Sequence, residues 1–356
     1  MTTLPQIDTP YLLDFLTKLL NTPSPTGFAE PAIALTEQTL KAFPFLSLSR
    51  TRKGALVARW EGDPSTRSRQ GDSPRTLTAH VDTLGAMVKE IKSDGRLKLT
   101  KVGNFAWNTV EGEGCWVFAS KGKKVRGSIL LDKASSHVYG TEVNETRRDD
   151  ENMEVRLDAR VQYADEAEKL GIRVGDFVAF DPRVEVTEGF IRSRHLDDKS
   201  GVACVVAAVR ALQDAGLQPE QTTYLHISNY EEVGHGAAAG IPAEVQELIA
   251  VDLAAIGAGQ ESDEFHATLC LKDSGGPYHH GLSQKLRTIA EKHNIPYKTD
   301  IYPHYGSDSE AFWRAGGDVA AALIGPGVDA SHNYERTHTE ALVATAKWLA
   351  AYLLEE

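Results

Sequence analysis

Hydrophobic and polar positions follow different patterns in successive parts of the 356-residue chain. In residues 11–20 and 28–43, apolar side chains recur at every third and fourth position, which predicts two amphipathic helices. Residues 46–60 are expected to form two short strands, and the apolar run at 77–81 predicts a buried strand with His80 near its end. The N-terminal part therefore begins an arrangement of helices and strands.

From about residue 85 to residue 190 the pattern changes to short alternating segments. These segments are separated by Gly, Asn and Asp, the residues that favour turns, which is typical of a small β domain built from hairpins. Within this region only residues 164–170 are expected to form a helix.

After Arg194, helical and strand patterns alternate. Predicted helices cover 198–212, 283–293, 308–315 and 339–354, and predicted strands cover 222–228, 248–253, 297–302 and 319–324. Such alternation predicts a largely parallel sheet covered by helices on both faces. The fold class is thus α/β, with a discontinuous α/β domain (1–84 and 191–356) and an inserted β domain (85–190).

Composition narrows the class of protein. The chain is 41% hydrophobic and 25% charged, as in globular proteins, and no apolar run approaches the roughly 18 residues of a membrane span. A net charge of −12 argues against a nucleic-acid partner, which requires concentrated Lys and Arg. The three cysteines are widely spaced and form no pair motif, and the first twenty residues lack a basic start, so a cytoplasmic location is expected. The polar stretch 63–75 predicts a surface loop.

The first candidate for chemistry is the His80-Val-Asp82 motif at the end of a predicted strand. Residues two apart in a strand face the same side, so the Asp82 carboxylate is expected to accept the imidazole N–H that is not needed for a metal. A histidine at a strand end that is satisfied by an aspartate in the next turn is the plainer interpretation, because this motif alone is weak.

Two pairs of acids follow later in the chain. Asp197-Asp198 opens a predicted helix, where acids also serve as caps, but a carboxylate such as Asp197 offers two oxygens and can bridge two ions. Glu231-Glu232 follows an apolar strand, where adjacent buried acids are costly without positive charge. One of them is expected to bind a metal and the other to act as a general base.

Asp252 and His332 complete the set, each after a predicted strand, and His332 is separated from its strand by a predicted Gly325-Pro-Gly turn. All the candidate positions are expected at strand ends of one sheet, where they would converge. Imidazole and carboxylate ligands without thiolates suit Zn, Co or Mn. The inventory is that of a two-metal hydrolase.

These motifs resemble the tetrahedral-assembly aminopeptidases, metallopeptidase family 42 of clan MH. The matching pieces, in chain order, are Ala79-His-Val-Asp82, Leu196-Asp-Asp-Lys199, Glu231-Glu-Val-Gly234, Val251-Asp-Leu253, Gly306-Ser-Asp308 and Ser331-His332. The resemblance implies a phosphorylase/hydrolase-like mixed sheet, a cis peptide between Asp197 and Asp198, and an inserted β-barrel-like domain for dimerisation. It also implies homo-oligomers, from dimers up to a tetrahedral dodecamer.

The resemblance further implies a role for each site residue. His80 and Asp252 would bind one divalent metal ion, Glu232 and His332 the other, with Asp197 bridging and Glu231 as catalytic base. Asp82, which is expected to fix the tautomer of His80, is the second residue predicted to serve catalysis. The pattern departs from the family at Thr83, where a Glu is usual, and around His332, where an Arg-Tyr pair usually comes before the histidine. His338 is therefore a rival for the last ligand position or a substrate contact.

Other segments resemble a branch of the family linked to the N-acetylglutaminylglutamine amide osmoprotectant system: Glu111-Gly-Glu-Gly-Cys115, Met153-Glu-Val-Arg156 and Ser193-Arg-His-Leu-Asp197. This branch would imply a dipeptide-like substrate, with His195, His279 and His280 as candidate pocket residues.

The expected function is a dinuclear aminopeptidase that removes N-terminal residues from short peptides, using a metal-bridging water activated by Glu231. The alternative is a deacylase of the same clan acting on a blocked dipeptide-like molecule. A glycosidase would also use paired carboxylates but has no role for the two histidines, and a catalytically silent assembly protein would lack a ligand, whereas none is missing here.

Overall fold

The computed structural model describes residues 4–64 and 72–355. Most of the polar stretch predicted as a surface loop, residues 65–71, lies outside the described residues. No helix among the described residues is long and apolar enough to cross a membrane.

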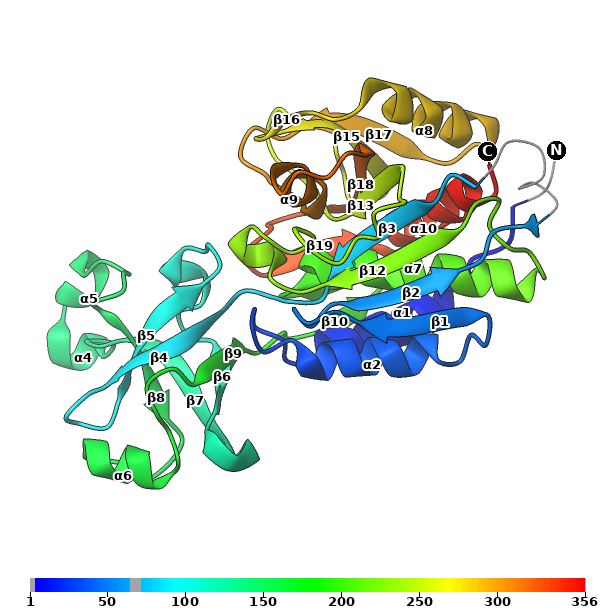
Figure 1. Ribbon diagram of the computed structural model, residues 1–356. Coiled ribbons are helices and arrows are strands. Elements are labelled where there is room, and N and C mark those ends of the chain that lie inside the picture. The colour runs from blue at the N-terminus through cyan, green and yellow to red at the C-terminus, as the bar shows by residue number, and fades with distance from the viewer. Residues whose placement is uncertain (1–3, 65–71, 356) are drawn as a thin grey trace.

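The larger body is built on a mixed sheet, which runs through the centre of Figure 1 in the order β1-β2-β12-β3-β13-β18-β15-β16, with β14 beside β18 and β17 beside β15. Its strands are β1 (Leu46–Arg50), β2 (Leu56–Trp60), β3 (Arg75–His80), β12 (Thr223–Ser228), β13 (Glu247–Val251), β14 (Ala254–Ala255), β15 (Ala267–Asp273), β16 (Gly276–Pro277), β17 (Tyr297–Ile301) and β18 (Ala320–Val328). The four central strands β12, β3, β13 and β18 are parallel, whereas β1-β2, β2-β12 and β15-β18 are antiparallel. The parallel centre therefore presents several strand carboxyl ends at one edge.

Alternate residues of the central strands enter two different cores. Ile249 and Ile324 face the core shared with the helices α1 (Thr9–Leu20), α2 (Glu30–Leu40), α7 (Leu196–Asp214), α8 (His280–Lys292) and α10 (Thr339–Leu353). Leu248 and Leu323 face the other core, against which Phe312 of α9 (Asp308–Arg314) packs. Both sheet faces are thus covered, although less helix lies on the second.

The smaller body is a closed barrel, separate from the main sheet in Figure 1, with strand order β4-β5-β8-β7-β6-β9. Its elements are β4 (Gly85–Ile91), β5 (Leu97–Val102), η1 (Trp107–Thr109), β6 (Gly114–Phe118), η2 (Ser120–Gly122), β7 (Lys124–Leu131), α4 (Ser136–Tyr139), α5 (Glu142–Glu145), β8 (Met153–Leu157), α6 (Ala164–Lys169) and β9 (Phe177–Phe180). The barrel has a hydrophobic core of its own, which includes Val88, Leu99 and Ile129.

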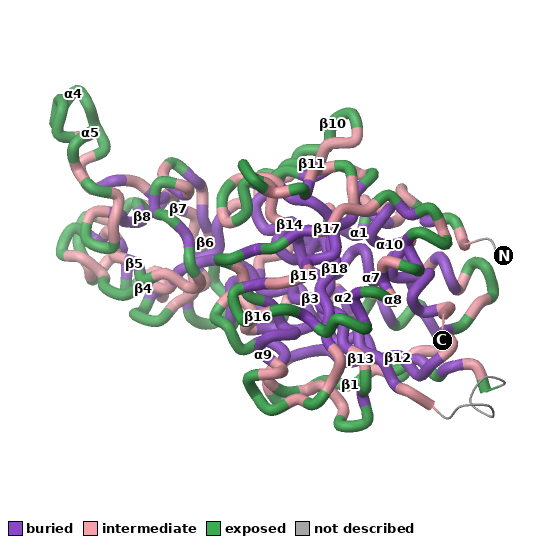
Figure 2. The backbone as a smooth tube through the Cα atoms, turned by 90° about the horizontal axis from the view of Figure 1, so that it is seen from above, coloured by how far each residue is buried: buried purple, intermediate pink, exposed green. Residues whose placement is uncertain are grey.

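The expectation that this region contains a single helix was wrong, because α4 and α5 are also helical. Each is a single turn of four residues with no buried side chain, so neither leaves an apolar period in the sequence. Figure 2 shows them projecting from the barrel as an exposed excursion.

A third, small sheet links the two bodies and consists of β10 (Glu185–Thr187), β11 (Phe190–Ser193) and β19 (Glu335–His338). It pairs the segment that returns from the barrel with the segment that follows β18. The three cysteines are free and buried, as small core residues.

Candidate functional site

Four of the sequence candidates lie at the carboxyl edge of the parallel centre. His80 is the last residue of β3, Asp252 directly follows β13, and Glu231 and Glu232 lie in the short helix η3 (Glu231–Val233) that follows β12. Because β12, β3 and β13 are parallel neighbours, their carboxyl ends bring these side chains together.

Asp197 and His332 reach the same place by another route, so the expectation that all the candidates end strands of one sheet was wrong. Asp197 lies at the start of α7, after β11 of the small sheet, and His332 lies in the loop between β18 and β19. The predicted turn at Gly325-Pro-Gly is part of β18. A Cβ on Gly325 would lie 1.7 Å from the Asp252 carbonyl oxygen, so this glycine allows close approach of two backbones within the sheet.

The Asp197 carboxylate lies between the two histidines. Its Oδ1 is 3.1 Å from His80 Nε2, and its Oδ2 is 3.3 Å from His332 Nε2. Glu231 Oε2 and Asp252 Oδ2 lie 3.6 and 4.0 Å from His80 Nε2. The arrangement can hold two cations side by side with one shared carboxylate.

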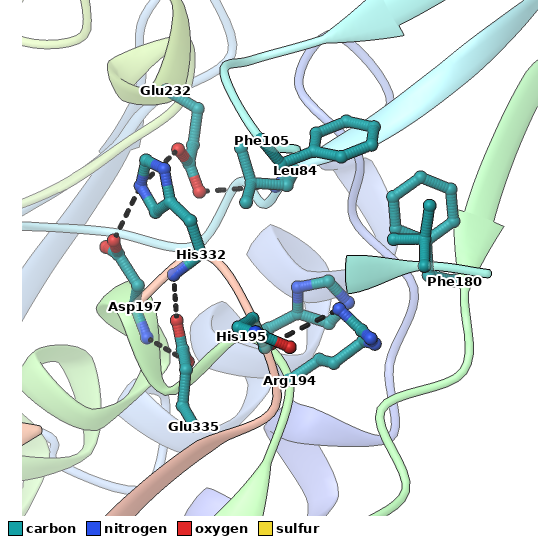
Figure 3. Close-up of a pocket in the computed structure, with 11 residues that line it drawn as sticks. Leu84, Phe105, Phe180, Arg194, His195, Asp197, Glu232, His332 and Glu335 are labelled. Carbon is teal, nitrogen blue, oxygen red and sulfur yellow. Dashed lines mark hydrogen bonds and ion pairs between the residues drawn. The ribbon is translucent and has the colours of Figure 1, made fainter. Parts of the chain in front are cut away.

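Three side chains that could together hold one metal ion, Asp197, Glu232 and His332, are shown in Figure 3. Glu232 Oε2 is 3.7 Å from His332 Nε2. These side chains come from α7, η3 and the loop after β18, and they point toward one another.

Asp198 differs from Asp197 in its contacts, although one of its oxygens also lies near ligand atoms of His80 and Asp252. Its oxygens accept the backbone N–H groups of His80, at 3.2 Å, and Gly201, at 3.0 Å. The peptide between Asp197 and Asp198 is cis. Asp198 thus supports the backbone at the start of α7, while Asp197 faces the histidines.

Asp82 does not accept the imidazole N–H through its carboxylate, as the motif had suggested. His80 Nδ1 lies 2.9 Å from the backbone oxygen of Asp82 and 3.7 Å from its Oδ1, so the carbonyl is the acceptor and Nε2 faces the Asp197 carboxylate. The Asp82 carboxylate instead accepts the Thr26 hydroxyl at 2.7 Å and the backbone N–H groups of Glu231 and Glu232 at 3.3 and 3.4 Å. It therefore positions the turn that carries both glutamates.

His332 is held by residues that sequence reasoning missed. Its Nδ1 donates to the Asn104 carbonyl oxygen, 2.6 Å away, in the barrel segment after β5. Glu335 accepts the backbone N–H of both His332, at 3.0 Å, and Asp197, at 3.2 Å (Figure 3). An acid three residues after the histidine was the only signal for Glu335, and nothing in the sequence pointed to Asn104.

The site contains several buried acids close together, and added positive charge would stabilise their ionised forms. Burial, and after it the opposing His80 charge and the Asp252 charge, leave the pKa of Glu231 well above its usual range, and burial followed by Asp197 does the same for Glu232. Burial and then Asp197 raise the pKa of Asp252 to about 7. Burial alone would lower the pKa of His80, but Glu231, Asp197 and Asp252 hold it well above its ordinary value.

Crowded carboxylates have raised pKa values when the positive charge of a bound cation is not included, so these shifts are typical of a cation site. Imidazole nitrogens and carboxylate oxygens, with no thiolate among them, are donors that divalent transition metals accept. The residues present therefore fit two divalent ions.

His338 and His280 lie away from this cluster. His338 caps α10 by accepting the Glu340 backbone N–H, and its ring packs against Phe190 and Phe265. His280 is an exposed residue at the start of α8. Neither lines the cavity of about 440 Å³ beside Glu231 and Asp252.

That cavity is also lined by residues of which sequence reasoning had singled out only Gly306 and Ser307, within the Gly306-Ser-Asp308 motif. They come from the loop before α9 and from α9 itself, and include His304, Tyr305, Ser307, Glu310 and Arg314. His304, Tyr305, Glu310 and Arg314 belong to none of the quoted motifs, because these side chains gather here only through the fold.

The α/β fold with a buried imidazole–carboxylate cluster at its strand ends defines a metal-binding hydrolase. The chain belongs to the M42 glutamyl aminopeptidase family, whose profile matches residues 64–348. It is thus an aminopeptidase, as the motifs had indicated, and the deacylase alternative is not favoured. The link to an osmoprotectant branch stays a prediction.

The similarity extends over nearly the whole chain. YhfE, a candidate aminopeptidase of Bacillus subtilis (strain 168), is 47% identical over 342 residues, which are 96% of each chain. An aminopeptidase from the archaeon Desulfurococcus kamchatkensis has the same fold, with a TM-score of 0.85 at 23% identity, covering 98% of this chain and 96% of the other. The TET1 peptidase of Pyrococcus horikoshii, described as assembling into a tetrahedron or a large octahedral shell, has a TM-score of 0.82 at 22% identity and coverages of 97% and 100%.

Proposed function

We propose that the chain is a dinuclear metal-dependent aminopeptidase that removes N-terminal residues from short peptides. His80 and Asp252 would hold one ion, Glu232 and His332 the other, and Asp197 would bridge them. The observation that carries the proposal is the position of Asp197, whose two oxygens face the Nε2 atoms of two different histidines at 3.1 and 3.3 Å. Zn or Co, and also Mn, suit this donor set.

Two bound divalent ions supply positive charge that polarises a scissile carbonyl and lowers the pKa of a bound water. Glu231 is the acid of the η3 pair that lies beside His80, and no hydrogen bond among the described residues engages its carboxylate. We assign it the role of general base, which takes a proton from the attacking water and passes it to the leaving amine. Glu232, by contrast, accepts the Leu84 backbone N–H at 3.2 Å and lies beside His332, which suits a ligand held in place.

We further propose that the inserted barrel, residues 85–190, mediates dimerisation, and that residues 1–84 and 191–356 form the catalytic domain. The exposed α4–α5 excursion and the assembly described for the Pyrococcus horikoshii TET1 peptidase support a homo-oligomer. Three free, buried thiols without a disulfide suit the reducing cytoplasm, where we place the protein.

The test of the catalytic proposal is the release of N-terminal residues from short peptides by protein loaded with Zn or Co. A chelator should abolish release, and added metal should restore it. Glu231→Gln keeps the shape of the side chain but removes the base, so the rate should fall by about 10²–10⁴-fold with the metal content unchanged. Full activity of this variant would exclude Glu231 as the base, and a preference for N-acetylated peptides would indicate a deacylase instead.

A further inference from the structure

The cavity beside the proposed metal site has a second chemical feature, a pair of opposite charges on α9. Besides Glu231 and Asp252, its lining includes Ser274, the loop before α9, and two charged side chains of α9, Glu310 and Arg314. A peptide whose amino end reached the site would place the side chain of its first residue in this space of about 440 Å³.

Glu310 is a buried acid without the donors that buried acids usually have. The residue is 8% exposed, and its Oε1 contacts the guanidinium of Arg314. Its ion-pair partner is Arg314, one helical turn later, whose side chain is 72% exposed. A buried carboxylate is normally satisfied by several donors, and this one depends on a single, mostly exposed cation.

The acids nearest to Glu310 show the contrast. Asp273 accepts the Gly275 backbone N–H at 2.8 Å and the Tyr278 hydroxyl at 2.5 Å. Asp308 accepts the Thr78 hydroxyl at 3.1 Å and the Ala237 backbone N–H at 2.7 Å. Both have structural partners within the protein, whereas Glu310 retains unused acceptor capacity at the cavity wall.

The backbone around Glu310 leaves room for its carboxyl group. A Cβ added to Gly275 would lie 2.3 Å from Glu310 Cδ, and a Cβ added to Gly306 would lie 3.1 Å from Glu310 Oε2. Two glycines on separate segments thus form a shallow cradle that any larger residue at position 275 would fill.

The groups that shift the pKa of Glu310 do not belong to the proposed metal site. Burial, and then the neighbouring Asp273, raise the pKa of Glu310, and Arg314 only partly offsets this. None of the acids around His80 and His332 is among these causes. Glu310 is therefore available to bind a cation other than the proposed metal ions.

We propose that Glu310 is a specificity-determining residue that binds the side chain of the substrate's N-terminal residue and selects lysine and arginine. The proposal rests on the aminopeptidase function proposed above. The cationic side chain takes the place of Arg314 on the buried carboxylate, and Arg314, already mostly exposed, moves into solvent at little desolvation cost.

The test compares kcat/KM for Lys-, Arg-, Glu- and Leu-p-nitroanilide, using metal-loaded wild type and Glu310→Gln. Wild type should favour Lys and Arg over Leu by about tenfold to a hundredfold, the usual weight of a hydrogen bond to a charged group. Glu310→Gln should lose this preference and gain activity toward Glu, because Arg314 is released to pair with an acidic side chain. Glu340→Gln, which removes a glutamate from the first turn of α10 instead of α9, should keep the wild-type profile.

A second variant, Gly275→Ala, leaves every charge in place and displaces only the Glu310 carboxyl group. It should raise KM for the Lys and Arg substrates more than KM for the Leu substrate. Activity without a preference for Lys and Arg, or a preference that survives Glu310→Gln, would overturn the assignment of Glu310 alone. Inactivity toward all four substrates and toward short peptides would overturn the aminopeptidase proposal instead.

Discussion

The crowding of acids around His80 predicts that the loss of one proposed metal ligand increases the stability of the metal-free protein. Asp252→Asn removes a proposed metal ligand, yet it should stabilise the metal-free protein at pH 8. Asp252 is buried and accepts the Leu253 backbone N–H at 2.7 Å. An Asn side-chain oxygen keeps this hydrogen bond, so the substitution removes charge and little else.

The magnitude follows from the pKa of Asp252, which burial and then Asp197 raise from 3.8 to about 7. An acid whose pKa is higher in the folded state contributes stability at low pH, and that contribution is lost as the pH rises from about 4 to about 7. A difference of about 3 pH units corresponds to about 4 kcal/mol. At pH 8 the charged Asp252 lowers the free energy of unfolding of the metal-free wild type. Asp252→Asn removes this charge and should raise the free energy of unfolding by up to about 4 kcal/mol.

The assay is urea unfolding in the presence of a chelator, at pH 5 and pH 8. Asp252→Asn should have the higher midpoint at pH 8 and a smaller advantage at pH 5. With excess Zn or Co the order should reverse, because a cation that binds only the folded wild type stabilises it. Asp214→Asn, at a half-exposed acid paired with Arg210 on α7, controls for the loss of charge itself. Equal or lower stability of Asp252→Asn at pH 8 without metal would refute the reasoning.

Further predictions concern the support of the site. Asp82→Asn places an amide N–H₂ where the carboxylate accepts the Glu231 and Glu232 backbone N–H groups or the Thr26 hydroxyl. It should cost about 1.5–3 kcal/mol for each hydrogen bond lost and lower kcat/KM at least tenfold, measured by steady-state kinetics. His332→Ala should bind one metal ion fewer per chain than wild type by elemental analysis, whereas His338→Ala should bind the same number. Equal metal content in these two variants would contradict the assignment of His332.

The long amphipathic elements could be predicted because their cores impose a period on the sequence. The helices at 9–20 and 196–214 and the strand at 223–228 lie where the apolar pattern indicates them, within a few residues. Segments without such a period were missed: α4 and α5 are exposed single turns, and β15 and β19 gave no alternation that was recognised.

The candidate site could also be predicted only in part. The residue types at positions 80, 197, 231, 232, 252 and 332 carry the chemistry, and their identity and order along the chain were sufficient to indicate a metal-binding aminopeptidase. What each one contacts depends on distances between segments far apart in sequence. Asp82 supports a turn that lies about 150 residues away, and Asn104 of the barrel orients His332, 228 residues away.

The sequence by itself determined the α/β class, the family and the set of donor side chains, because composition, period and motif are local properties of the chain. Only the tertiary structure decided which oxygen faces which histidine, that Asp198 supports the backbone while Asp197 lies between two imidazoles, and that the buried Glu310 lines the same cavity with Arg314 as its ion-pair partner. The physical reason is that hydrogen bonding and charge act over a few ångströms in space, regardless of the separation along the chain.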